Sequence, residues 1–209
     1  VGTQALESNT VGDRSVAIGH GALNQQNPAS KSDMNNTAVG LNAGASNSTG
    51  SANTFLGSEA GDSLTTGANN TVIGYASDPS SATVSNEFTL GNGNISSLRC
   101  ADTSIASLSD RRDKTNIQDS TYGLEFINQI RPVQFTWDRR NLVEGDLESP
   151  HNGKTRIGFI SQELQEAMQD NSNEILDLVY EENPERLEVK QGKLIPILTK
   201  AIQELSAKV

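Results

Sequence analysis

The chain has 209 residues, a formal net charge of −10 and a sequence pI of about 4.6, so nucleic acid or an anionic membrane is disfavoured as its partner. Its single cysteine, Cys100, excludes an intrachain disulfide, and no Cys/His cluster has zinc-site spacing, so we expect no metal and no cofactor. No run approaches the ~18 apolar residues of a membrane span, no signal peptide is visible, and the first residues continue a pattern, which suggests a piece of a longer protein.

The two halves of the chain differ sharply in composition. Residues 1–108 contain 11 charged side chains and 13 glycines, whereas residues 109–209 contain 31 charged side chains and 5 glycines. This shift predicts two domains, residues 1–108 and residues 109–209.

The first half repeats itself at a nearly fixed spacing. Each unit carries an anchor glycine after an apolar residue, at positions 2, 19, 40, 57 and 74, so the intervals are 17, 21, 17 and 17. An Asn-Thr pair begins four residues before three of these anchors, at Asn36, Asn53 and Asn70. The longer interval predicts a four-residue insertion within residues 24–33. Fixed spacing of this kind argues against a disordered Gly/Asn/Ser segment.

Each unit offers a short apolar strand followed by a turn rich in Gly, Asn and Ser. We expect strands at residues 16–18, 54–56 and 71–73, one more strand at residues 87–91, and a polar lead at residues 95–107. One short strand cannot bury its apolar side chains alone, so the units must stack into a β-solenoid or β-roll. Aromatic residues form only 4% of the chain, so the core is thin, which favours an oligomer.

Residues 1–76 resemble the head repeats of trimeric surface adhesins and the shafts of phage tail fibres. This resemblance implies a trimeric shaft, and it concerns architecture rather than chemistry.

A serine and a lysine stand five residues apart where the two halves meet. The hydroxyl of Ser109 is a weak nucleophile until a base takes its proton, and a desolvated Lys114 is a possible base. Spacing alone does not join them, because five residues place two side chains on opposite faces of a strand and far apart around a helix. They meet only through a bend or between chains. Without further information, both are ordinary surface residues.

The second half predicts an α+β domain. Ser120 or Thr121 is expected to cap a helix that carries Leu124, Ile127 and Ile130 on one face. Strands are expected at residues 133–137 and 156–160, separated by a polar loop over residues 141–152. Ser161 is expected to cap the next helix, and residues 175–180 and 187–189 are expected to form a hairpin across an acidic turn.

The C-terminal residues predict a final helix that begins near Leu194, because Pro196 is tolerated only in a first turn. Two adjacent heptad seams run along it, so the apolar stripe is wide. One seam contains Leu194, Leu198, Ala201 and Leu205, and the other contains Ile195, Ile202 and Val209. This pattern favours a long trimeric coiled-coil-like helix, and a helix packed on its own domain is the open alternative.

Residues 109–117 fit the S-D-x-R-x-K signature of the endosialidase-type C-terminal intramolecular chaperone domain, an autoproteolytic peptidase family. Further matches follow in order, at residues 122–124, 131–133, 157–164, 194–196 and 200–205. The resemblance implies that Ser109 is the nucleophile, that Lys114 is the general base, and that Asp110 and Arg112 support the motif. The bond between Leu108 and Ser109 is then the one that is cut. Asp113 departs from the apolar residue expected at that position.

The resemblance implies a domain that trimerises and folds a viral tail fibre or tailspike and then cleaves itself off. We therefore expect a homotrimer of a virion protein, assembled in the host cytoplasm, with the chaperone part released and no nucleic acid or membrane insertion. The receptor of the fibre is not indicated. The alternative is a non-cleaving structural adhesin shaft with an inert C-terminal trimerisation domain.

Overall fold

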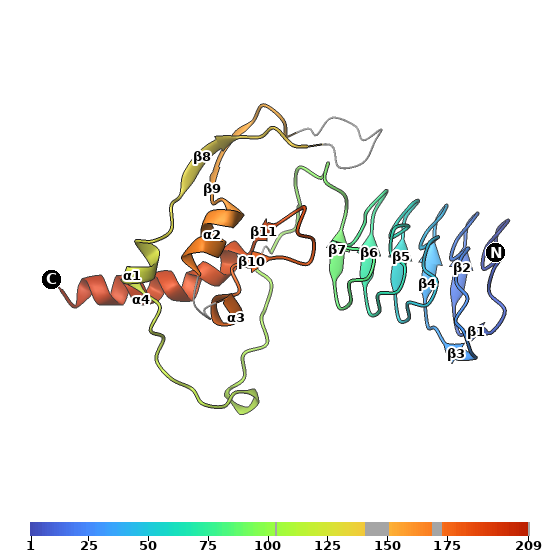
Figure 1. Cartoon of the computed structure of the whole chain (residues 1–209), viewed down its shortest axis with the longest axis horizontal. Helices are drawn as coiled ribbons and strands as arrows, with labels where there is room; N and C mark the ends of the chain where they lie inside the picture. The colour runs from blue at the N-terminus through green and yellow to red at the C-terminus, as the bar shows by residue number, and fades with distance from the viewer. Residues whose placement is uncertain (103, 141–150, 169–172, 209) are drawn as a thin grey trace. The chain divides into compact units, whose positions relative to one another are not determined.

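The computed structural model describes residues 1–209 except 103, 141–150, 169–172 and 209. The chain divides into two compact units, Val1–Ser96 and Ser97–Val209 (Figure 1). The first unit is a β-solenoid and the second combines short strands with helices.

The solenoid is built on one parallel five-stranded sheet whose strands follow one another in chain order. The strands are β2 (Val16–Ile18), β4 (Thr37–Val39), β5 (Thr54–Leu56), β6 (Thr71–Ile73) and β7 (Phe88–Leu90). From β4 onward each residue pairs with the residue 17 positions later, for example Thr54 with Thr71. The repeat interval of the sequence is therefore the length of one solenoid turn, which confirms the predicted architecture.

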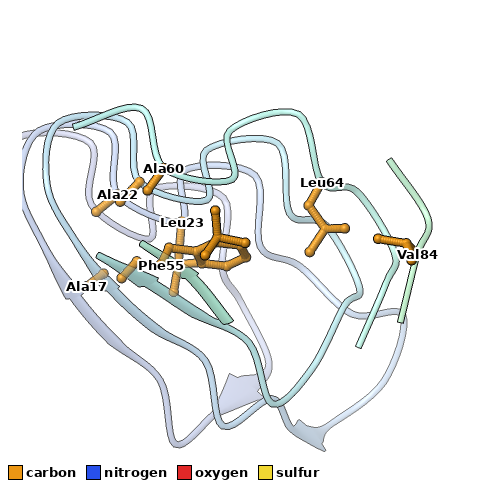
Figure 2. Packing of buried hydrophobic residues seen from close by; sticks show 10 residues of the cluster. Ala17, Ala22, Leu23, Phe55, Ala60, Leu64 and Val84 are labelled. Carbon is orange, nitrogen blue, oxygen red and sulfur yellow. The ribbon is translucent and has the colours of Figure 1, made fainter. Parts of the chain in front are cut away.

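The middle residue of each strand points into the solenoid. Ala17, Ala38, Phe55 and Val72 occupy this position and are buried, and Figure 2 shows Phe55 packed among smaller aliphatic side chains. Phe55 fits because Gly44 and Gly61 lie against its ring. A Cβ atom on Gly44 would lie 2.6 Å from the ring, and one on Gly61 would lie 2.3 Å from it.

A ladder of buried asparagines explains the repeated Asn-Thr pairs. Asn36, Asn53 and Asn70 are fully buried. The Oδ1 of each accepts a hydrogen bond from the backbone N–H one turn later, at 2.8 to 2.9 Å. The Nδ2 of each donates to a backbone carbonyl oxygen, at 2.7 to 2.8 Å. Buried polar groups are stable only when they are paired in this way.

The segment in which the insertion is predicted, residues 24–33, ends in a short strand that pairs with an earlier one. β1 (Gly12–Asp13) lies parallel to β3 (Ser32–Asp33). Two exposed ion pairs, Arg14 with Asp33 and Lys31 with Asp13, join the same segments. Exposed ion pairs contribute little, about 0–1 kcal/mol each. The buried Gln26 ties the same segment to the solenoid, since its Oε1 accepts from the Asn36 Nδ2 at 2.9 Å.

The second unit has short elements around a core of its own. They are η1 (Arg111–Asp113), α1 (Leu124–Ile127), β8 (Val133–Thr136), β9 (Thr155–Gly158), α2 (Ser161–Ala167), α3 (Asn173–Leu176), β10 (Val179–Tyr180), β11 (Glu188–Val189), η2 (Gln191–Lys193) and α4 (Leu194–Ser206). The antiparallel pairs β8–β9 and β10–β11 and the final helix agree with the predicted α+β class.

Three local predictions need correction. α1 begins at Leu124 rather than after a cap at Ser120 or Thr121, because the Ser120 hydroxyl bonds instead to the backbone of Tyr122. Ser161 is the first residue of α2 rather than its cap. Residues 175 and 176 belong to α3, so the predicted hairpin is limited to β10 and β11. Most of the predicted polar loop, residues 141–150, lies outside the described residues.

α4 separates the wide stripe of the sequence into two faces. Leu194, Ile197 and Ala201 are buried in the core of the second unit. The other face carries exposed apolar side chains at intervals of 3, 4 and 3 residues: Ile195, Leu198, Ile202 and Leu205. The first face explains how the helix is held on its domain, and the second leaves a heptad-spaced surface on the outside.

Candidate active site

The bend at η1 brings the two motif residues together within one chain. The Lys114 Nζ donates a hydrogen bond to the Ser109 Oγ at 2.5 Å. In an extended strand the two Cα atoms would stand ~16 Å apart, beyond the reach of a lysine side chain. The 3₁₀ turn between them shortens this path, so it supplies the bend that the spacing requires.

Two main-chain hydrogen bonds close the turn. The backbone N–H of Asp113 donates to the Asp110 carbonyl oxygen, and that of Lys114 donates to the Arg111 carbonyl oxygen, both at 3.2 Å. η1 buries none of its residues. Its conformation therefore depends on local hydrogen bonds and not on apolar packing.

The Asp110 side chain is the N-cap of this turn. Its Oδ1 accepts from the backbone N–H of Arg112 at 2.8 Å. Its two carboxylate oxygens also accept from the Arg112 guanidinium, with Nε at 3.1 Å from each and one terminal nitrogen at 2.6 Å. Hydrogen bonds from Arg112 hold the pKa of the Asp110 carboxyl below its ordinary value. Sequence reasoning named these two residues as motif members but did not assign them this cap.

The peptide bond before Ser109 is accessible. Leu108 is fully exposed, and residues 104–110 lie outside any helix or strand. A nucleophile, a basic nitrogen within proton-transfer distance of it, and an accessible carbonyl one residue away are the components of serine peptidase chemistry. Asp113, the departure from the expected motif, lies inside the same turn.

Other kinds of site are not indicated in the described part of the chain. There, no group of three or more His, Cys, Asp and Glu side chains is arranged to hold a metal ion. Among the described residues, no helix is both long and apolar enough to cross a membrane. The Cys100 thiol is exposed and donates to the Asp102 carbonyl oxygen at 2.7 Å.

One carboxyl group of the solenoid has a strongly altered environment. Half-burial raises the pKa of Asp62 to about 6, and the negative charges of Asp78 and Glu59 add to the effect. Asp62 borders a polar depression of about 300 Å³ on the solenoid surface, which Glu7 and Asn24 also line. This depression has no apolar wall or buried unpaired group that would indicate a ligand.

The comparisons with known proteins concern the second unit. Residues 109–172 match the family model Peptidase_S74, described as the chaperone of endosialidase. Residues 109–172 are therefore similar to the chaperone-of-endosialidase domain, a family that implies self-cleaving peptidase domains in general. The match begins at Ser109. Comparison with curated proteins and with solved structures gives no significant match.

Proposed function

We propose that residues 109–209 trimerise and fold a fibre shaft built from residues 1–108, and then cut the chain between Leu108 and Ser109. The observation that carries this proposal is the 2.5 Å contact between Lys114 Nζ and Ser109 Oγ, at the first residues of the matched domain. The family supports a C-terminal chaperone role, and the contact supports a cutting role for this pair.

The proposed reaction uses Ser109 as nucleophile and Lys114 as base. Neutral Lys114 takes the hydroxyl proton while Oγ attacks the carbonyl carbon of Leu108. The bond from that carbon to the Ser109 nitrogen breaks, and the nitrogen takes the proton from Lys114. Water then hydrolyses the ester between Leu108 and Oγ, which leaves a carboxylate on Leu108 and a free amino group on Ser109.

Assembly would supply the environment that this reaction needs. Lys114 is exposed to water in the single chain. Packing of neighbouring chains around the turn would remove water and favour the neutral amine. Cutting would then occur only in a correctly assembled particle, and so would report that assembly is complete.

An exposed apolar surface on the solenoid supports self-association of the shaft. The first and third residues of the strands point away from the core, and several of them are large and apolar. Val16, Ile18 and Leu56 are each 48% exposed, Leu90 is 50% exposed and Phe88 is 65% exposed. Contiguous apolar patches beyond a few hundred Å² are rare on monomers and mark interaction surfaces.

The exposed face of α4 supports association through the second unit. Ile195, Leu198, Ile202 and Leu205 have the a/d spacing of a coiled coil. Ile at a and Leu at d suits two strands in an isolated coiled coil. The proposal of three chains rather than two therefore comes from the resemblance. The mass of the particle in solution tests it.

The proposed setting is a phage tail fibre or tailspike. Three repeat-built shafts align with one another slowly. Pairing between strands that are far apart in sequence requires loop closure before any contact forms. A C-terminal trimer raises the effective concentration of the three chains and would nucleate the shaft. Once the chaperone part is released, a shaft that unfolded could not easily refold. The stability of the released shaft would therefore be kinetic, set by its rate of unfolding.

The second candidate function is a non-cleaving shaft with an inert trimerisation domain. The exposure of Lys114 and of η1 in the single chain favours this alternative. A denaturing gel of the purified chain with N-terminal sequencing separates the two. The proposal expects fragments of 108 and 101 residues (209 − 108 = 101), the second beginning at Ser109. An uncut trimer would support the alternative.

A further inference from the structure

We infer that Asp110 and Arg112 form a clamp that positions Lys114 on Ser109, with Asp110 as the positioning residue. The inference rests on the proposed cutting function. It explains why Lys114 lies within hydrogen-bond distance of Ser109. Asp110 touches neither Ser109 Oγ nor Lys114 Nζ in the contacts described above, so it acts through the turn.

The clamp concentrates its hydrogen bonds on one carboxylate. The Asp110 carboxylate accepts from the Arg112 backbone N–H, from Nε and from a terminal guanidinium nitrogen. The backbone bond fixes the start of η1, and the guanidinium bonds fix the rotamer of the carboxylate that makes it. The two residues are only two positions apart, so the clamp closes within the turn itself.

Among the described residues, the turn has two side-chain contacts across it: the Asp110 cap and the Lys114–Ser109 contact that the cap is inferred to position. η1 contains no buried residue, so apolar packing does not select this conformation over an extended one. Its two remaining hydrogen bonds are between backbone groups, which any sequence supplies. The part of this turn that depends on the sequence is therefore the cap. If the cap is lost, the extended backbone carries Lys114 away from Ser109.

Arg112 has a second role in the clamp. A free carboxylate beside a lysine would pair with the ammonium and favour its charged form, which cannot accept a proton. The Arg112 guanidinium donates to both oxygens of Asp110, with Nε shared between Oδ1 and Oδ2 and a terminal nitrogen on Oδ2. Arg112 therefore keeps the carboxylate on the turn and away from the amine.

The test measures self-cleavage in the full-length chain with Asp110 replaced. Asp110→Ala removes the cap and should slow cleavage at least tenfold. Asp110→Asn keeps an oxygen that accepts from the Arg112 backbone N–H and should recover much of the rate. Asp119→Ala is the control, because it removes a nearby exposed carboxylate that lies outside the turn and leaves the cap intact. It should cleave within about twofold of the wild type.

Two readouts separate the clamp from a general folding role. The mass of the particle and its thermal unfolding should be the same in all variants, since η1 is exposed. In a Lys114→Ala background, which is not expected to cut, the Arg112 Nε–H should exchange slowly with water in NMR spectra. Its exchange should become fast on Asp110→Ala.

The outcomes distinguish this inference from the proposed function. An uncut wild-type chain overturns the function, and slow exchange of Arg112 Nε–H would still support the clamp. Cleavage of Asp110→Ala at the wild-type rate overturns the clamp and leaves the function standing. Failure of Asp110→Asn to exceed Asp110→Ala would overturn the role of the cap.

Discussion

The carboxylate of Glu204, near the end of α4, accepts a hydrogen bond from the backbone N–H of Leu124, the first residue of α1, at 2.8 Å. Eighty residues of chain separate the two groups. The bond satisfies one of the unpaired N–H groups at the start of α1, which has no side-chain cap of its own. Through it the last helix of the chain stabilises the first helix of the domain.

Replacing Glu204 should destabilise the second unit. Glu204→Ala removes the acceptor and should cost about 1–2 kcal/mol, the usual loss when a helix cap is removed. Glu204→Gln keeps an oxygen acceptor and should cost less. Trp137 is the only tryptophan and lies in the second unit, so its fluorescence during urea unfolding measures the effect. Equal midpoints for Glu204→Ala and the wild type would contradict the prediction.

Replacing either member of the proposed dyad should leave a full-length chain. Ser109→Ala removes the nucleophile and Lys114→Ala removes the base. Lys114→Arg should also fail, because a guanidinium remains protonated at any working pH. A denaturing gel of each purified variant gives the result. Complete cutting of Lys114→Ala, or a new N-terminus other than Ser109, would refute the assignment.

Mixed particles test whether the dyad forms within one chain. The contact between Lys114 and Ser109 lies within a single chain. Chains carrying Ser109→Ala, refolded together with chains carrying Lys114→Ala, should therefore stay uncut. Restored cutting in the mixture would mean that each serine uses the lysine of a neighbour.

A charge on the outer face of α4 should prevent assembly. Leu198→Asp places a carboxylate in the exposed heptad stripe, where burial between chains would be costly. Light scattering should report a monomer, and cleavage should stop with it. Gln203→Asp adds the same charge to an exposed position outside the stripe and should leave the trimer intact. A Leu198→Asp trimer would exclude this face as an interface.

The buried asparagine ladder should be essential to the solenoid. Asn53→Ala removes the acceptor for the Asn70 backbone N–H and the donor to the Gly67 carbonyl oxygen. Two buried groups lose their partners, at a cost of about 1–3 kcal/mol each. Circular dichroism should show a clearly lower unfolding temperature. Thr66→Ala, at an exposed position of the same turn, is the control and should change it little. An unchanged Asn53→Ala variant would argue against the ladder.

The solenoid should become less stable as pH rises from about 4 to above 6. The folded chain raises the pKa of Asp62 from 3.8 to about 6, mainly through burial and then through Asp78 and Glu59. Folding therefore favours the protonated carboxyl, and this stabilisation is present at low pH and is lost as pH rises through 6.

Asp62→Asn should remove this dependence. At pH 7 its unfolding temperature should exceed that of the wild type by ~2–4 °C, a figure reduced for solvent screening of a half-exposed group. At pH 4 the two proteins should unfold at similar temperatures. Thermal unfolding of the Ser109→Ala background at both pH values measures the difference. A lower unfolding temperature for Asp62→Asn at pH 7 would contradict the argument.

The repeat half was predictable from sequence because its contacts obey the repeat. A strand such as Thr54–Leu56 pairs with the strand one period later, so a constant interval in the sequence becomes a constant register in the sheet. The Asn-Thr pairs marked this register, although their role as a buried ladder required the structure. The pattern could not show that two glycines flank Phe55, because Gly44 and Gly61 meet that ring from different turns.

The second half was predictable in its motif and only partly in its elements. The short helices of this unit do not begin at their local capping signals: the Ser120 hydroxyl bonds to the Tyr122 backbone, and Ser161 is the first residue of α2. Sequence alone could single out Ser109 and Lys114 as candidates and the last helix as broadly apolar, because residue type and spacing are properties of the chain. It divided the helix wrongly, because Leu198 and Leu205, placed in one seam with Leu194 and Ala201, lie on the outer face, and the buried Ile197 was in neither seam. The tertiary structure decided that Leu194 faces the core while Ile195 faces outward, and that a 3₁₀ turn brings Lys114 to Ser109. Both depend on how the backbone bends and what it packs against, and spacing along the chain does not specify either.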